Sequence, residues 1–191
     1  MSNTNPVHRV VLVGDTCVGK TCLVHRLKEN NFEESVETTV AADVTPINTK
    51  YDDKPFSFTL CDTAGQEKYR SLAPIYFRGA DIAFIVYDIT NCGSFKSVET
   101  WYKIIQTTSK DIKKIILIGN KRDLIDERTV STIDAQDLAC RLGFANYIEV
   151  SCKTGEYMTE LLYITCQQLL ELEPNTNTGS NLSANNNSKC C

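Results

Sequence analysis

Short apolar runs alternate with amphipathic segments along the chain. The continuous apolar runs predict strands, at residues 7–13, 44–51, 56–61, 82–87, 115–118 and 147–150. The segments with helical spacing predict helices, at residues 22–28, 94–108, 131–142 and 156–172. Strands that are apolar throughout are typical of sheets buried on both faces. The pattern therefore predicts an α/β fold with a mostly parallel sheet covered by helices on both sides.

One connection between neighbouring strands is much shorter than the others. The polar turn YDDK at residues 51–54 joins two adjacent strands and predicts a hairpin. A hairpin makes its strands antiparallel, so we expect one antiparallel edge strand. On the helix at residues 94–108, we interpret Trp101 and Tyr102 as packing residues rather than functional ones.

Length and composition limit the domain organisation and the class of partner. The 191 residues, 42% of them hydrophobic, suffice for one sizeable core. We expect a flexible N-terminus at residues 1–6, a domain at 7–172 and a flexible polar tail at 173–191. The net charge of -4, without a Lys/Arg cluster, argues against nucleic-acid binding. Nine cysteines without paired CxxC spacing, and no signal peptide, favour a reduced cytosolic protein.

A glycine-rich motif, GDTCVGKT at residues 14–21, follows the first predicted strand and precedes a helix. In this context it is typical of a phosphate-binding loop, whose backbone N–H groups point at phosphate oxygens. Lys20 adds a positive charge for the outer phosphates, and Thr21 offers a hydroxyl to Mg²⁺. The predicted phosphate site comprises Gly14, Asp15, Thr16, Cys17, Val18, Gly19, Lys20, Thr21 and Cys22.

Three other predicted strands end in polar motifs: CDTAGQE at residues 61–67, NKRD at 120–123 and SCK at 151–153. Ligands of such sheets bind outside the carboxyl ends of the strands, so we expect all four motifs at one edge. Asp62 can hold Mg²⁺ through a water. Gly65 can bring its N–H close to a terminal phosphate, and Gln66 can orient a water for in-line attack.

The NKRD motif selects the base. A carboxylate at Asp123 can accept hydrogen bonds from guanine N1–H and the 2-amino group, whereas adenine would leave that carboxylate unpaired. Asn120 can tie this loop to the phosphate loop or to the base, and the stems of Lys121 and Lys153 can cover the ring faces. The SCK residues Ser151 and Cys152 follow another predicted strand at the same edge.

With these motifs, residues 7–172 resemble the Ras superfamily of small GTPases and, within it, the Rab family. The most specific stretch is DTAGQEKYRSLAPIYFRGADIAFIVYDIT, in which QEKYR and YFRGA are similar to Rabs and SLAP to their endosomal branch. The resemblance implies a three-layer P-loop GTPase fold, with a six-stranded, mostly parallel sheet, one antiparallel edge strand and about five helices.

The resemblance also implies roles for residues outside the motifs. Phe32 matches the aromatic residue packed on guanine, and Thr39 matches the threonine that reaches Mg²⁺ and the terminal phosphate. Backbone N–H groups of Ala64 or Gly65 would hold phosphate, and the SCK loop with Ser151 and Cys152 would hold guanine. The expected metal ligands are Thr21, Thr39 and Asp62, and the expected catalytic residues are Lys20, Thr39, Gly65 and Gln66.

The function that the resemblance implies is a GTP-hydrolysing switch in vesicle traffic. GTP would hold segments 32–43 and 62–79, and hydrolysis would release them. Hydrolysis should be slow, because we find no arginine placed in cis, so an activating protein would supply one. The expected partners of the monomer are an exchange factor, an activating protein, effectors, an escort protein and a dissociation inhibitor.

The chain ends in Lys189, Cys190 and Cys191. A terminal cysteine pair can be incidental or a metal or redox pair, but on a Rab-like domain it resembles the double geranylgeranylation signal. Two lipid chains suffice for stable anchoring where one does not. The expected location is the cytosolic face of an internal membrane, of endosomal type by the SLAP similarity.

The chain departs from the Rab pattern at four positions. Rabs carry aromatic residues where this chain has Val44 and Cys61, which with Tyr76 match a triad read by partners. Two missing rings remove about 3 kcal/mol of potential contact, so we predict altered effectors. Ala41 replaces a glycine of the first switch. Cys152 replaces an alanine whose contacts run through its backbone, so guanine binding should survive.

Two other functions are consistent with a phosphate loop. A phosphate-loop kinase or ATPase would have no use for NKRD and SCK and would need a lid with arginines; competition of ATP against labelled GTP distinguishes it. A module that holds GTP without turnover is disfavoured by Gln66, Thr39 and Thr21, and single-turnover phosphate release distinguishes it.

Overall fold

The computed structural model describes residues 8–29, 43–63 and 73–173. They form a six-stranded sheet in the order β2-β3-β1-β4-β5-β6, in which β2 and β3 are antiparallel and the other pairs parallel. The strands are β1 (His8–Val13), β2 (Asp43–Tyr51), β3 (Lys54–Asp62), β4 (Ile82–Asp88), β5 (Lys114–Asn120) and β6 (Asn146–Glu149). The predicted fold class, including the antiparallel edge strand, is confirmed.

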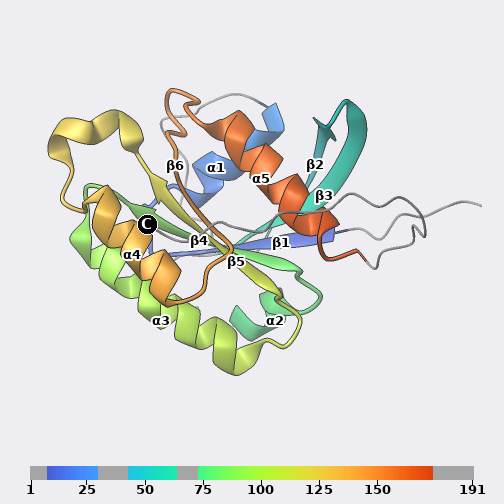
Figure 1. Ribbon diagram of the computed structural model, residues 1–191, viewed down its shortest axis with the longest axis horizontal. Helices are drawn as coiled ribbons and strands as arrows, with labels where there is room; N and C mark the ends of the chain where they lie inside the picture. Colours follow the sequence, from blue (N-terminus) through green and yellow to red (C-terminus); the bar gives the residue numbers. More distant parts are fainter. Residues whose placement is uncertain (1–7, 30–42, 64–72, 174–191) are drawn as a thin grey trace, which may run out of the picture.

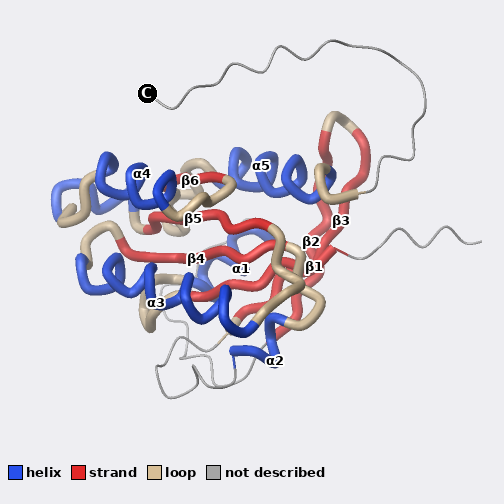
Figure 2. The backbone as a smooth tube through the Cα atoms, turned by 60° about the horizontal axis from the view of Figure 1, so that its bottom comes forward, coloured by secondary structure: helices blue, strands red, loops and turns tan. Residues whose placement is uncertain are grey.

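Helices cover both faces of this sheet (Figures 1 and 2). In the described residues they are α1 (Lys20–Glu29), α2 (Ala73–Phe77), α3 (Cys92–Thr108), α4 (Thr132–Arg141), α5 (Met158–Leu170) and the 3₁₀ helix η2 (Arg122–Glu127). The apolar pattern did not predict α2 and η2, which are too short to show a helical period. None of the helices in this part of the chain has the length and apolar character to cross a membrane.

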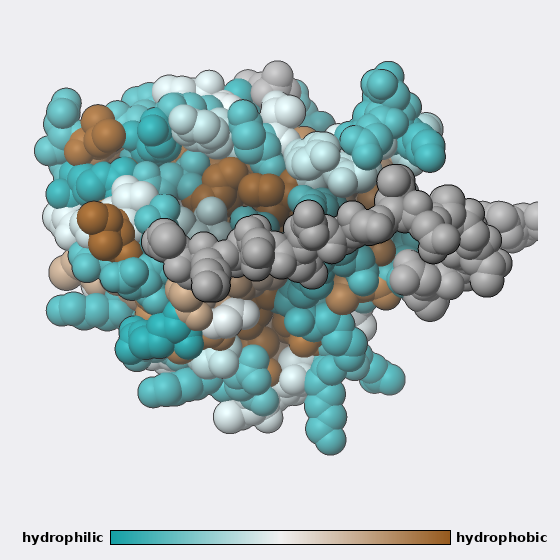
Figure 3. All heavy atoms as spheres, in the orientation of Figure 1, coloured by the Kyte–Doolittle hydropathy of each residue, from teal (hydrophilic) through white to brown (hydrophobic). Residues whose placement is uncertain are grey.

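Alternating residues of the strands supply the two halves of the core. Val10 and Leu12 of β1 face α1 and α5, whereas Val11 and Val13 face α2, α3 and α4. The central strand β4 is buried along its whole length. The face seen in Figure 3 is largely hydrophilic, because the apolar runs of the chain are buried between the sheet and the helices on its two sides.

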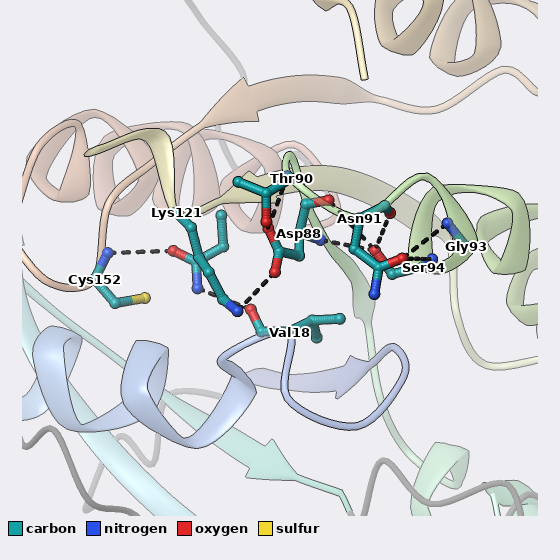
Figure 4. Close-up of polar contacts among 9 residues, drawn as sticks. Val18, Asp88, Thr90, Asn91, Gly93, Ser94, Lys121 and Cys152 are labelled. Carbon is teal, nitrogen blue, oxygen red and sulfur yellow. Dashed lines mark hydrogen bonds and ion pairs between the residues drawn. The ribbon is translucent and has the colours of Figure 1, made fainter. Parts of the chain in front are cut away.

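The connection from β4 to α3 stays close to the sheet edge because a cap starts the helix. Asn91 lies just beyond β4, and its side chain accepts hydrogen bonds from the backbone N–H groups of Gly93 and Ser94 (Figure 4). Asparagine is among the preferred residues at this position, because its side chain satisfies N–H groups that the helix leaves unpaired. The cap places the first turn of α3 beside the ends of β4 and β5.

Candidate nucleotide site

The phosphate loop lies between β1 and α1, at the carboxyl edge of the sheet. Two of its glycines are required by space and by backbone conformation. A Cβ on Gly14 (φ +147°) would lie 2.2 Å from the carbonyl oxygen of Val86, and one on Gly19 (φ +94°) would lie 2.3 Å from Asn120 Nδ2. The loop can therefore close tightly against β4 and β5, which leaves its N–H groups to face a ligand.

Lys20 curls back over this loop. Its ammonium donates to the carbonyl oxygens of Gly14, at 2.9 Å, and Asp15, at 2.7 Å. Only 6% of the residue is exposed, and this burial lowers the pKa of Lys20 to about 8, although the carboxylates of Asp62 and Asp15 act in the opposite direction. A buried cation in the loop is suited to bind phosphate.

Thr21 and Asp62 bring two oxygen groups together beside the loop. The Thr21 hydroxyl donates to Asp62 Oδ2 at 2.6 Å, and Asp62 is 3% exposed at the end of β3. A hydroxyl and a carboxylate are hard oxygen donors, the kind that Mg²⁺ prefers. These two residues fit a magnesium ion, whereas the third expected ligand, Thr39, lies outside the described residues.

Asn120 links the phosphate loop to the SCK loop. Its Nδ2 donates to the carbonyl of Val18 at 2.8 Å, and its Oδ1 accepts from the N–H of Cys152 at 3.2 Å. Of the two roles considered for Asn120, the tie to the phosphate loop is the one that the structure shows. Burial raises the pKa of the Cys152 thiol to about 12, so this side chain is neutral. The contact of Cys152 with Asn120 runs through its backbone N–H.

Ser151 positions the carboxylate predicted to read guanine. The Ser151 hydroxyl donates to Asp123 Oδ1 at 2.6 Å and accepts from the N–H of Thr154 at 3.0 Å. Ser151 is fully buried, whereas Asp123 is half-buried at the start of η2. The hydroxyl therefore fixes the Asp123 carboxylate without facing solvent itself.

Lys121 is held by an ion pair behind the base loop. Its ammonium lies 2.6 Å from Asp88 Oδ2, and Asp88 Oδ1 accepts from both the N–H and the hydroxyl of Thr90 (Figure 4). With the charged end fixed, the apolar stem of Lys121 is the part available to cover a ring face. Lys153, expected to cover the other face, is exposed.

Three residues of this region were not expected from the sequence as parts of the site: Arg26, Asp88 and Trp101. Arg26 of α1 donates to the carbonyls of Cys152, at 2.7 Å, and Lys153, at 2.6 Å. Trp101 is buried as expected, but its indole N–H also donates to Asp15 Oδ1 at 3.0 Å. No local motif predicts these contacts, because the partners are distant in sequence.

Several expected site residues lie outside the described residues: Phe32, Thr39, Ala41, Ala64, Gly65, Gln66, Cys190 and Cys191. The structure therefore describes the phosphate loop, Asp62 and the loops at residues 120–123 and 151–153. The roles of the residues outside the described ranges stay predictions.

The expected effector surface is only partly exposed. Val44 is 50% exposed, and Tyr76 is partly exposed next to Ile75, which is 67% exposed. Cys61, which we expected at the surface, is instead fully buried, with its thiol 3.5 Å from Arg9 Nη2. It pairs with Val44 across the β2–β3 ladder, so both side chains lie on the same face of the sheet. Cys61 belongs to the core cluster that includes Phe77 of α2, whereas Val44 stays half-exposed. Of this pair, only Val44 can be touched by a partner.

Comparison with known proteins finds relatives of one family. Residues 9–171 match the sequence model of the Ras family. The GTP-binding protein Rab-3D of Rattus norvegicus is 38% identical over 184 residues, which cover 94% of this chain and 84% of the relative. The Ras-related protein RABF2b of Arabidopsis thaliana is 38% identical over 169 residues, covering 88% and 84%. The human Ras-related protein Rab-3D is 36% identical over 184 residues, covering 94% and 84%.

Proposed function

The chain belongs to the Ras family and is a Rab small GTPase, and from this premise we propose how its own residues hold the nucleotide. It binds GTP, hydrolyses it to GDP and regulates vesicle traffic. The proposal assigns phosphate binding to the loop at residues 14–22 and guanine recognition to the loops at 120–123 and 151–153.

The observation that carries this assignment is the double tie made by Asn120. One amide side chain joins the phosphate loop, through Val18, to the SCK loop, through Cys152. The phosphate end and the base end of the site are therefore one connected unit. Asp123, oriented by Ser151, accepts from guanine N1–H and its 2-amino group, and a base without those donors leaves a charge unpaired.

At the phosphate end, Lys20 neutralises the outer phosphates, and Thr21 with Asp62 holds Mg²⁺. Held by these two residues, Mg²⁺ would supply positive charge that offsets the negative charge of the phosphates. Gln66, Gly65 and Thr39 are proposed to orient water and hold the terminal phosphate, on the strength of the family resemblance. The slow intrinsic rate is then raised by an activating protein, and an exchange factor releases GDP.

The base assignment is tested by Asp123→Asn. The substituted amide offers a donor where the carboxylate accepted two hydrogen bonds, so we expect GDP affinity to fall by at least about a hundredfold and xanthosine diphosphate to become the better ligand. Affinities of fluorescent guanine and xanthine nucleotides give the ratio directly. Asp126→Asn, an exposed position on the same 3₁₀ helix, is the matched control. Unchanged preference in Asp123→Asn overturns the assignment, as does displacement of GTP by equimolar ATP.

For the whole chain, we propose that Cys190 and Cys191 carry geranylgeranyl groups and anchor it to the cytosolic face of an internal, endosomal membrane. An escort protein and a dissociation inhibitor would handle the lipidated monomer, and two chains give the anchoring that one does not. Replacement of both cysteines by serine should move a tagged protein from membranes to the cytosol, and retention on membranes would refute this.

A further inference from the structure

The second residue of the phosphate loop, Asp15, carries a negative charge into a site proposed to bind phosphates. Like charges a few ångströms apart repel, and water screens them less when they are partly buried. Asp15 is half-buried, and its carboxylate is close enough to Lys20 to act on the pKa of that ammonium. The direction in which this carboxylate is held therefore affects whatever anion the loop binds.

Trp101 of α3 determines that direction. Its indole N–H donates to Asp15 Oδ1 at 3.0 Å, across 86 positions of sequence. The ring is 3% exposed and packs with Val98 and Ile105 on the sheet face that α3 covers. A buried ring has little freedom, so the N–H is a fixed donor. It is also the only tryptophan in the chain.

Asp15 thus receives hydrogen bonds from two helices, α1 and α3. Lys20 donates to its main-chain carbonyl at 2.7 Å, and Trp101 donates to its side chain. The neighbouring Gly14 has no room for a side chain, so the backbone on that side is fixed as well. The carbonyl remains turned to Lys20 while the carboxylate is turned to α3.

We propose that Trp101 is a positioning residue of the nucleotide site, whose N–H holds the Asp15 carboxylate against α3 and away from the bound phosphates. The proposal rests on the phosphate site proposed above. It also couples α3 to the phosphate loop, since a displacement of Trp101 would release a negative charge beside the nucleotide.

Trp101→Phe tests this, because it keeps an aromatic ring and removes the donor. We expect release of a fluorescent GDP analogue to accelerate about tenfold, the size of a lost hydrogen bond to a charged group. The acceleration should shrink as KCl rises from 50 to 500 mM, because salt screens the repulsion. Adding Asp15→Asn to Trp101→Phe should bring release back to within about threefold of the unmodified protein. A packing defect at position 101 would show neither the salt dependence nor the rescue, and either absence overturns the proposal.

A second pair of variants leaves the core intact should Trp101→Phe fold poorly. Asp15→Glu moves the charge by one methylene, away from the position in which the Trp101 N–H holds it, whereas Asp15→Asn has no charge to misplace. We expect Asp15→Glu to release GDP faster than Asp15→Asn, and equal or reversed rates refute the proposal. Tyr102→Phe is the matched control, since Tyr102 lies on the same helix but packs on Phe144, and its release rate should be unchanged. Lys20→Ala tests the phosphate site separately: if it retains GDP normally, the proposed site fails, and if it loses GDP while Trp101→Phe does not, only the role of Trp101 fails.

Discussion

Lys20 shows how a single buried charge sets the conditions under which this site works. Burial lowers its pKa to about 8, so in the nucleotide-free protein the ammonium loses its proton just above neutral pH. A bound phosphate adds negative charge and favours the protonated form, so binding takes up a proton at higher pH. We expect GDP affinity to fall about tenfold between pH 7 and pH 9. Titrations at both pH values, in buffers of different ionisation enthalpy, measure the affinity and the proton uptake.

The lowered pKa of Lys20 also makes the stability of the folded protein depend on pH. Between pH 8 and 10.5 the unfolded chain binds more protons at Lys20 than the folded protein does, so this group's contribution to stability rises with pH over that window. Affinity and stability should therefore change in opposite directions. In Lys20→Arg the side chain stays protonated over this pH range. Any loss of affinity in that variant therefore comes from another titrating group, including the guanine base of the nucleotide. An equal loss of affinity in Lys20→Arg would assign the effect to another group.

At the scale of elements, α1 serves both ends of the site. Its first residue is Lys20, and six residues later Arg26 donates to the carbonyls of Cys152 and Lys153. Arg26→Met keeps an unbranched apolar stem and removes the guanidinium that makes both bonds. We expect GDP release to accelerate about tenfold, because the SCK loop loses its tie to the helix. Stopped-flow displacement of a fluorescent GDP measures the rate.

Lys28→Met is the matched control on the same helix. Lys28 is exposed and pairs with the adjacent Glu29 at 3.0 Å, so its loss should leave release unchanged. If Arg26→Met also releases GDP at the original rate, the tie from α1 to the SCK loop does not control release.

Elements were predictable to different degrees. The strands follow from continuous apolar runs, and the hairpin follows from its polar turn, where Asp52 and Asp53 adopt positive φ. The helix α1 begins two residues earlier than its apolar spacing predicts, because it starts at Lys20, inside the polar motif. The 3₁₀ helix η2 escaped prediction, since it is six residues long and has no buried residue to mark a period.

For the whole molecule, the place of the site followed from topology, but its internal contacts did not. Parallel strands bring the motifs at residues 14, 62, 120 and 151 to one edge, so spacing and the strand-end rule were sufficient. The contacts of Trp101 with Asp15 and of Arg26 with Cys152 join positions 86 and 126 residues apart. Only packing of the whole domain determines such pairs, which is also why the burial of Cys61 was missed.

The burial of Cys61 means that substitutions at Val44 and at Cys61, which the sequence treats as one surface, should have different effects. Val44 is exposed, so Val44→Phe adds a ring where a partner can touch it, and we expect an effector of the endosomal branch to bind the GTP-loaded variant about tenfold more tightly. Cys61 is fully buried beside Arg9, so Cys61→Trp overfills the core and should lower the free energy of unfolding by about 1–3 kcal/mol. Calorimetry of binding and urea unfolding measure the two effects.

The control for the surface effect is Asn48→Phe, which adds the same ring at an exposed position further along β2. Partners that bind the switch region should not contact a ring at position 48. A gain in affinity confined to Val44→Phe therefore assigns effector choice to position 44. Equal gains in both variants would mean that any exposed ring promotes association. No gain in Val44→Phe would mean that a ring at this exposed position does not determine effector choice.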